Sequence, residues 1–189
     1  MNEGCVKQMQ KPYFRDIWAL GPPTTGYPGA FPRGLITRVK RRWWGTNRLW
    51  MFSGGYQANG DITVDCKPEL KPKTIANCEI LPFKDNSFDF VFADPPYSKE
   101  ESMDLYQLKY VNIIKTINEM VRVCKPGGNL LFLHRLIPEV FPGMNLHKET
   151  TLEGIVGIFT IAGMSNIRAL SVRRKNNTFE EFTDEDAQV

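Results

Sequence analysis

The sequence lacks any long apolar run. No stretch of its 189 residues approaches the roughly 20 consecutive apolar residues that a helix needs to cross a bilayer. Residues 1–10 contain no apolar stretch of the kind found in a secretory signal. We therefore expect a cytoplasmic protein with no membrane partner. Hydrophobic residues make up 42% and charged residues 24% of the chain, as in ordinary globular proteins, and the length suits one domain with one core.

Cysteine is sparse and widely spaced. The four cysteines are Cys5, Cys66, Cys78 and Cys124. No two of them form a C-x-x-C pair, so neither a zinc site nor a disulfide framework is predicted. We expect reduced thiols and no bound metal.

The net charge of +3 is too small to indicate a polyanionic partner by itself, but the charges are unevenly distributed. Basic residues gather in the segment 33–48, whereas acidic residues gather in 180–186. A clustered basic region can form an electrostatic footprint for nucleic acid, and it can equally be a solvated helix face. Both interpretations stay open at this point.

The glycine patterns that bind phosphate groups are also missing. The chain has neither a Walker A sequence nor a G-x-G-x-x-G fingerprint, so phosphate or dinucleotide binding is not supported. The segment 53–55 (SGG) follows an apolar stretch and would let a ligand approach the backbone closely. The same residues also suit a plain turn.

Apolar periodicity predicts strands that alternate with helices. The expected strands are 48–52, 62–64, 74–76, 88–93 and 129–134, followed by an antiparallel pair at 155–161 and 167–172. Helical spacing is clearest from Ile113 to Cys124, and a shorter basic helix is expected after Pro32. This order predicts an α/β fold with a mostly parallel sheet and a C-terminal antiparallel pair.

The domain organisation follows from these elements. We expect an irregular N-terminal arm over 1–31, because glycine, proline and aromatic residues occur there without a clear period. One folded domain should cover 32–175, and an acidic, flexible tail should cover 176–189.

Polar signals occur where three predicted strands end. The glycine segment 53–55 follows the first of these strands, Asp65 ends the second, and the segment 94–97 (DPPY) follows a later one. In open α/β sheets, ligands bind beyond the carboxyl ends of the strands. A carboxylate such as that of Asp65 can accept hydrogen bonds from both hydroxyls of a ribose. These coincident strand ends predict the active site.

The segment Asp94, Pro95, Pro96 and Tyr97 has specific chemical capabilities. Its two prolines fix the backbone and remove two donors, which leaves a rigid cluster of acceptors at the Asp94 carboxylate and the Pro95 carbonyl. Two acceptors that take both N–H bonds of an exocyclic amine would orient its lone pair towards a methyl donor. Tyr97 could stack on the ring that carries the amine, a contact worth about 1–3 kcal/mol. A base within a duplex would first have to be flipped out.

Together these residues resemble the amino-type DNA methyltransferases, which methylate adenine N6 or cytosine N4 and have the Rossmann-like class I methyltransferase fold. The most specific part of the resemblance is the catalytic motif, matched by Asp94, Pro95, Pro96 and Tyr97. The resemblance covers about residues 27–175, a compact form without a target-recognition domain. It implies an enzyme that uses S-adenosyl-L-methionine as the methyl donor.

The resemblance also implies a set of cofactor-binding residues. The segment 52–55 (FSGG) is similar to the family's cofactor loop, and Asp65 matches its ribose-binding acid. The segment 27–32 (YPGAFP) resembles the motif that packs on the methionine end. The implied cofactor contacts are Phe31, Phe52, Ser53, Gly54, Asp65, Asn77 and Cys78.

The chain departs from the family pattern in ways that leave alternatives open. Only residues 53–64 separate the cofactor loop from Asp65, so the helix expected there is missing or reduced to one turn. The cofactor loop has no acidic residue for the methionine amino group. The acceptor could be DNA, RNA, or an amide or amine outside nucleic acid, and the chain could also be a non-catalytic binding module. DNA is the favoured partner, with a homodimer or a partner subunit supplying target recognition.

Overall fold

The computed structural model describes residues 13–23, 26–27, 29–43, 45–57, 59–140, 146–160 and 167–177. The described residues form three α-helices, three short 3₁₀-helices and one eight-stranded sheet. The helices are α1 (Leu35–Arg42), α2 (Lys99–Tyr106) and α3 (Ile113–Val123). The strands are β1 (Phe14–Leu20), β2 (Arg48–Met51), β3 (Ile62–Asp65), β4 (Thr74–Ile75), β5 (Phe88–Ala93), β6 (Cys124–His134), β7 (Thr150–Thr160) and β8 (Arg168–Lys175).

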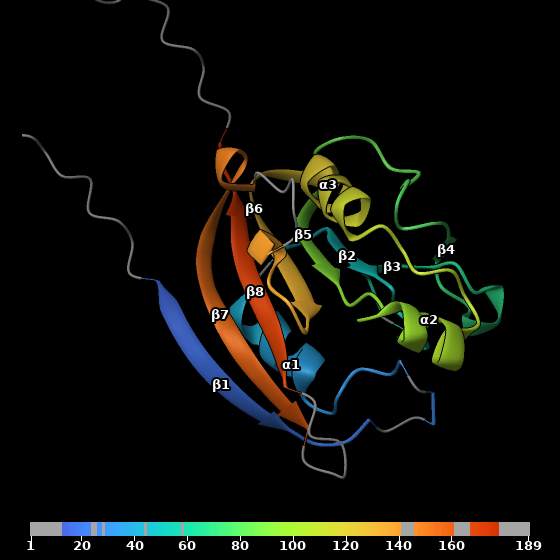
Figure 1. Ribbon diagram of the computed structural model, residues 1–189. Helices are drawn as coiled ribbons and strands as arrows, with labels where there is room; N and C mark the ends of the chain where they lie inside the picture. Colours follow the sequence, from blue (N-terminus) through green and yellow to red (C-terminus); the bar gives the residue numbers. More distant parts are fainter. Residues whose placement is uncertain are drawn as a thin grey trace, which may run out of the picture.

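The strand order across the sheet is β1-β7-β8-β6-β5-β2-β3-β4. Each strand pairs in parallel with its neighbours except β8, which is antiparallel to both β6 and β7 (Figure 1). The predicted Rossmann-like sheet with a C-terminal antiparallel pair is therefore confirmed. From β4 to β6 the order matches that of doubly wound folds, and the chain direction across the sheet reverses between β2 and β5.

The N-terminal region differs from its sequence-based prediction. Instead of an irregular arm, the segment Phe14–Leu20 forms the edge strand β1, which pairs with β7 from Phe14 opposite Gly154 to Leu20 opposite Thr160. Charged residues interrupt its apolar pattern, and its partner is more than a hundred residues away along the chain. Local periodicity therefore gave no sign of it. The sheet thus begins before residue 32, and the predicted acidic tail lies, from residue 178 onward, outside the described residues.

The core has two layers because side chains alternate between the faces of the sheet. Leu49, Val91 and Leu130 lie on the face covered by α3, whereas Trp50, Phe92 and Leu131 lie on the face covered by α1. Figure 1 shows α1 and α3 on opposite sides of the sheet. Trp43, which follows the last residue of α1, is buried against Trp18 of β1 and anchors this helix to the sheet. Among the described residues, no helix combines the length and the apolar character needed to cross a bilayer.

The connection from β2 to β3 is short, as predicted. Residues 52–61 join two parallel neighbours, and no helix forms among those that are described. An aromatic cluster fills the space beneath them, in which the ring centroids of Phe31 and Trp50 lie 5.7 and 5.3 Å from that of Tyr56. The connection therefore packs against these aromatic side chains and contains no helix among its described residues.

A buried carboxylate fixes the end of this connection. Asp61 is fully buried and accepts hydrogen bonds from Arg48 Nε at 2.7 Å and Trp50 Nε1 at 2.9 Å. The Nζ atom of Lys40, from α1, lies 2.6 Å from its second oxygen. Burial acts to raise the pKa of Asp61, but the hydrogen bonds from Lys40, Arg48 and Trp50 outweigh it and lower the pKa. The ionised carboxylate thus joins α1, β2 and the connection.

We expect Asp61→Ala to lower the free energy of unfolding by about 3–5 kcal/mol, because it leaves buried donors and a cation without a partner. Urea unfolding followed by circular dichroism would measure this loss. Asp85→Ala is the control: Asp85 is 70% exposed in its ion pair with Arg122, so its loss should cost at most about 1 kcal/mol. Equal losses in the two variants would contradict the structural role of Asp61.

Candidate functional site

Two adjoining cavities open at the carboxyl edge of the sheet, beside the ends of β2, β3 and β5. The larger has a volume of about 400 Å³ and the smaller about 240 Å³. Four residues line both of them, namely Gly29, Asp94, Pro96 and Tyr106. The cavities lie next to the point where the strand order reverses, which is where ligands bind in open α/β sheets.

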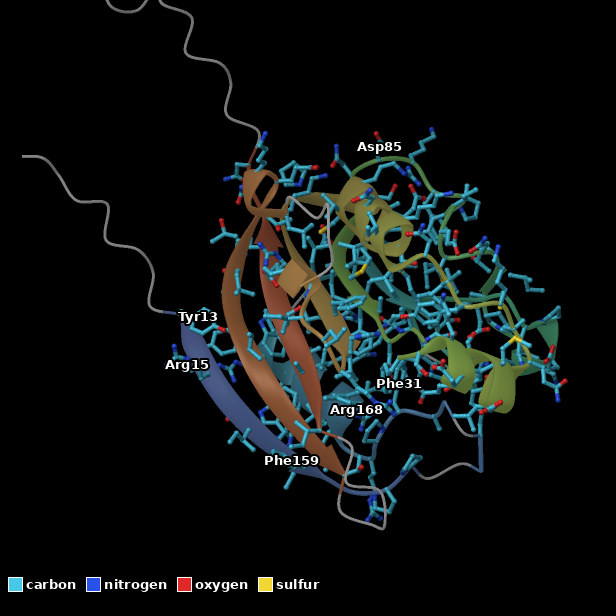
Figure 2. The ribbon with its side chains drawn as sticks, viewed as in Figure 1. Tyr13, Arg15, Phe31, Asp85, Phe159 and Arg168 are labelled. Carbon is cyan, nitrogen blue, oxygen red and sulfur yellow. The ribbon has the colours of Figure 1, made fainter. Side chains whose placement is uncertain are left out.

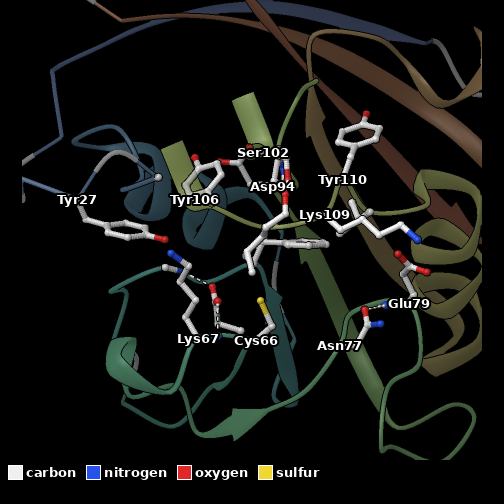
Figure 3. Close-up of a pocket in the computed structure, with 17 residues that line it drawn as sticks. Tyr27, Cys66, Lys67, Asn77, Glu79, Asp94, Ser102, Tyr106, Lys109 and Tyr110 are labelled. Carbon is white, nitrogen blue, oxygen red and sulfur yellow. Dashed lines mark hydrogen bonds between the residues drawn. The ribbon is translucent and has the colours of Figure 1, made fainter. Parts of the chain in front are cut away.

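The larger cavity, here called the cofactor cavity, is elongated (Figure 3). Tyr27 and Tyr106 lie at one end, and their ring centroids are 6.3 Å apart. Asn77 and Glu79 lie at the other end, and Asp94 lies between the two groups. Its volume falls within the roughly 300–1,000 Å³ that is typical of small-molecule sites.

Asp65 is the buried acid on the floor of this cavity. One of its carboxylate oxygens accepts a hydrogen bond from the Gly54 N–H at 2.9 Å, and the other accepts one from the Lys67 N–H at 3.1 Å. Burial raises the pKa of Asp65 even though these backbone groups favour the ionised form. Each oxygen has a further lone pair, so additional donors in the cavity, such as a pair of ribose hydroxyls, would stabilise the charge.

The loop after β2 approaches the cavity through its backbone. Phe52 has a φ of 55°, an unusual value for a residue with a side chain, and Gly54 has a φ of 53°. A Cβ atom at Gly54 would lie 3.1 Å from the Tyr27 ring and 3.4 Å from the carbonyl oxygen of Gly29. Glycine is therefore needed at position 54 both for the backbone conformation and for the space.

The structure brings together most of the predicted cofactor residues. Phe52, Gly54, Asp65 and Asn77 line the cofactor cavity. Ser53 and Cys78 are buried close by in the sequence but are not part of its lining. Burial raises the pKa of the Cys78 thiol far above its usual value, so it acts as an apolar core side chain.

Phe31 does not lie where the resemblance placed it. It lines neither cavity and instead packs on the α1 face of the sheet, with its ring centroid 5.5 Å from that of Phe92. The physical reason is the short connection after β2, which leaves a gap that Phe31 and Tyr56 fill. Tyr27 and Gly29, from the same motif, line the cofactor cavity.

At the boundary of the two cavities, Asp94 and Tyr97 are joined by a hydrogen bond. The Tyr97 hydroxyl donates to Asp94 Oδ1 at 2.6 Å. Burial raises the pKa of Asp94 to about 6, against the opposing charge of Arg168 and the Tyr97 hydrogen bond. A carboxylate with this pKa is ionised at neutral pH and is also able to take up a proton.

The neighbours of Tyr97 restrict how its ring can be used. His134 meets the ring edge-on with centroids 5.3 Å apart, and the Arg135 guanidinium lies 5.3 Å from the ring centroid. A substrate ring that stacks on Tyr97, as predicted, would therefore have to lie on the face of the Tyr97 ring that Arg135 does not cover. Burial, with the nearby Arg135 charge, lowers the pKa of His134 to about 4, so this histidine is neutral at physiological pH.

The smaller cavity, here called the acceptor cavity, contains residues that sequence reasoning missed. Arg168, Glu101 and Thr160 line it together with Asp94, Pro95, Pro96 and Tyr97. Arg168 is the first residue of β8, and because β8 runs antiparallel this start lies at the edge where the other strands end. The ends of the predicted strands do not include Arg168. The signal that could have found it is the predicted antiparallel pair, because an antiparallel strand begins at the edge where the parallel strands end.

Two tyrosines also line the cofactor cavity. Tyr106 ends α2 and Tyr110 lies in the segment before α3, which begins only at Ile113. The Ser98 side chain caps α2 by accepting a hydrogen bond from the Glu101 N–H. Other lining residues that the sequence did not reveal are Cys66, Lys67, Glu79, Leu108, Lys109 and Val111.

The basic segment 33–48 does not form one free cationic surface. Lys40 and Arg48 pair with Asp61, and Arg42 pairs with Asp16. Arg48 begins β2, at the sheet edge opposite the two cavities. Three of the six basic residues in this segment are therefore paired with acidic residues of the chain, which reduces the value of the segment as a sign of nucleic-acid binding.

The residues of the cofactor cavity fit S-adenosylmethionine. Asp65 offers acceptor sites for ribose hydroxyls, Gly54 leaves room beside the backbone, and Asn77 supplies a polar group at the far end. The neighbouring wall carries Asp94, which faces the acceptor cavity as well. A methyl donor and a methyl acceptor would thus meet at Asp94.

Comparisons with known proteins agree with this assignment. Residues 63–132, less than half of the chain, match the family model described as a methyltransferase domain. A Caenorhabditis elegans protein named sterol 4-C-methyltransferase strm-1 is 37% identical over 75 residues. That match covers 39% of this chain and only 18% of the relative.

A solved structure with a TM-score above 0.5 shows the same fold. The N-methyltransferase NodS from Bradyrhizobium japonicum WM9, in complex with S-adenosyl-l-homocysteine, is 16% identical with a TM-score of 0.52, and the match covers 75% of this chain and 83% of that one. TrmN from Thermus thermophilus is 17% identical with a TM-score of 0.49, and the match covers 74% of this chain and 47% of that one. The family match and this fold agree with a cofactor cavity for S-adenosylmethionine.

We expect Gly54→Ala to weaken the binding of S-adenosylhomocysteine by about tenfold or more, because the added Cβ strains the loop and meets Tyr27. Isothermal titration calorimetry would measure this change. Gly55→Ala is the matched control, since a Cβ atom there meets nothing within 4 Å. Unchanged affinity in Gly54→Ala would show that the ligand does not use this loop.

Proposed function

We propose that this chain, which carries a class I S-adenosylmethionine-dependent methyltransferase domain, methylates the exocyclic amino nitrogen of a nucleobase in DNA, either adenine N6 or cytosine N4. The observation that carries the proposal is the position of Asp94 in the wall shared by the cofactor and acceptor cavities. Its carboxylate is followed by two prolines and a tyrosine, so the acceptor groups are rigid.

The chemistry begins with an amine that is a poor nucleophile because its lone pair is delocalised into the ring. One Asp94 oxygen accepts the Tyr97 hydrogen bond, and the other oxygen and the Pro95 carbonyl are acceptors suited to the two amine N–H groups. Such bonds favour a pyramidal nitrogen whose lone pair points away from the acceptors. The orientation supplied by Asp94 and Pro95 is the main catalytic contribution of the chain.

S-adenosylmethionine supplies, when bound, a methyl carbon on a positively charged sulfur. The amine nitrogen gains a bond to this carbon while the bond from the methyl carbon to sulfur breaks, with S-adenosylhomocysteine as the leaving group, and the nitrogen must then lose one proton. Asp94 is hydrogen-bonded to that nitrogen in the proposed arrangement, and with a pKa of about 6 it can accept the proton and pass it to solvent.

A flat ring suits the acceptor cavity. Prolines and aromatic rings line much of it, and its volume of about 240 Å³ is smaller than a typical drug-sized site. A base in a duplex would have to flip out to reach Asp94. The described residues contain no separate recognition domain, so we propose that a second copy or a partner subunit supplies sequence recognition.

The direct test is incubation of the protein with radiolabelled S-adenosylmethionine and unmethylated duplex DNA, followed by digestion to nucleosides. We expect label in N6-methyldeoxyadenosine or N4-methyldeoxycytidine, and a loss of kcat of about 100-fold or more in Asp94→Ala. Single-stranded DNA, RNA and free nucleosides run in parallel. Label in RNA alone would replace DNA as the acceptor, and cofactor binding without any labelled base would refute the proposed acceptor class.

The pKa of Asp94 leads to a second expectation. The ionised carboxylate accepts the amine N–H, so protonation below pH 6 removes an acceptor. We expect kcat/KM to fall as the pH drops through about 6 and to level off above it. In Asp94→Asn, this fall should be absent from whatever activity remains. A profile that is flat from pH 5 to 8 in the wild type would contradict the role of an ionised Asp94.

A further inference from the structure

Arg168 is a partly buried cation in the lining of the acceptor cavity, and the chemistry proposed above assigns it no role. Arg168, at the start of β8, lines this cavity with Asp94, Tyr97 and Glu101. Figure 2 shows Arg168 at the same end of the sheet as Phe31, next to the ends of the parallel strands. Its strand runs opposite to β5 and β6, so it reaches Asp94 from a part of the chain more than seventy residues away.

The contacts of Tyr97 connect this cation to Asp94. Arg168 Nη1 donates to the Tyr97 hydroxyl oxygen at 3.3 Å, and the same hydroxyl donates to Asp94 Oδ1 at 2.6 Å. At its backbone, Tyr97 donates its N–H to Glu101 Oε2 at 2.9 Å. The tyrosine is thus held at both ends, and its hydroxyl lies between a cation and an anion.

The other charged groups near Asp94 do not replace Arg168. Glu101 is a second anion, which opposes ionisation of Asp94. Arg135 lies over the Tyr97 ring with its Nη2 atom 3.8 Å from Glu101 Oε1, so its charge is directed towards that carboxylate. His134 is neutral at physiological pH, and the phenol of Tyr106 is uncharged there because burial raises its pKa. Arg168 is the cation that acts on Asp94.

We propose that Arg168 is a positioning residue for the methyl acceptor, which acts through the Tyr97 hydroxyl to keep the Asp94 carboxylate ionised and fixed in one orientation. The hydrogen-bonded oxygen is held by Tyr97, so the other oxygen is directed to the substrate amine. This inference rests on the proposed function, because it assigns a role within the same amine-binding site.

The test compares Arg168→Gln with Arg168→Lys and with the control Arg174→Gln. Arg174 lies on the same strand but pairs with Glu153 away from both cavities. An opposite charge within about 4–6 Å lowers a carboxyl pKa by about 1–3 units, so its removal should shift the acid limb of kcat/KM upward by about one unit or more. Arg168→Lys should restore much of this shift, and Arg174→Gln should show the wild-type profile.

The pattern of losses decides between two roles for Arg168. The proposal expects the activity of Arg168→Gln to approach that of wild type at high pH, where Asp94 is ionised without help. A loss that is equal at every pH and appears only in KM would mean that Arg168 binds the acceptor directly, and it would overturn the proposal.

A readout independent of the acceptor separates this inference from the proposed function. The carboxyl ¹³C resonance of Asp94, assigned by its absence in Asp94→Asn, can be titrated in wild type and in Arg168→Gln. A higher pKa in the variant supports the role of Arg168 even if no nucleobase is methylated, in which case only the proposed acceptor fails. An unchanged pKa overturns the inference whatever the acceptor is.

Discussion

The geometry of the site depends on the hydrogen bonds and ion pairs of the buried Asp61 carboxylate. This carboxylate holds Lys40 of α1, Arg48 and Trp50 of β2, and the end of the short connection that leads into β3. In a parallel pair this connection usually contains a helix, which would fix the spacing of the two strand ends by its own packing. Here the ion cluster and the aromatic support under Tyr56 do so instead. The loop at Gly54 and the acid at Asp65 consequently meet at hydrogen-bonding distance although only ten residues separate them.

Asp65 is buried and Asp94 is partly buried, and the environments of the two acids differ. Asp65 is hydrogen-bonded by backbone N–H groups of its own loop and its neighbour, which is a local arrangement suited to holding a ligand. Asp94 is hydrogen-bonded by a side chain, that of Tyr97, which is itself bonded to Arg168 from a distant strand. This difference matches the proposed division between a cofactor-binding acid and an acid that contacts the reacting amine.

Much of the fold could be predicted from the sequence because the central strands have strong local patterns. Phe88–Ala93 is buried on both faces, and Ile113–Val123 carries a clear helical stripe. The strand β1 could not be predicted in this way, since its pairing with β7 compensates for an irregular pattern. For the site, the ends of the predicted strands indicated Gly54, Asp65 and Asp94, and all three line the cofactor cavity. Phe31 was misplaced because the resemblance assumed a helix that this chain lacks, and Arg168 was missed because its strand runs in the opposite direction.

The two cavities thus differ in how many of their lining residues can be predicted from the order of the strands along the chain. The cofactor cavity is built chiefly from segments that follow consecutive parallel strands, so the order of the chain alone brings them to one edge. The acceptor cavity adds Thr160 at the end of β7 and Arg168 at the start of β8, whose positions depend on how the antiparallel pair joins the sheet. A change in that pairing would leave Asp65 and Gly54 in place while it altered the surroundings of Asp94. In the proposed site, the surroundings of the methyl acceptor therefore depend on the antiparallel pair, whereas those of the methyl donor do not.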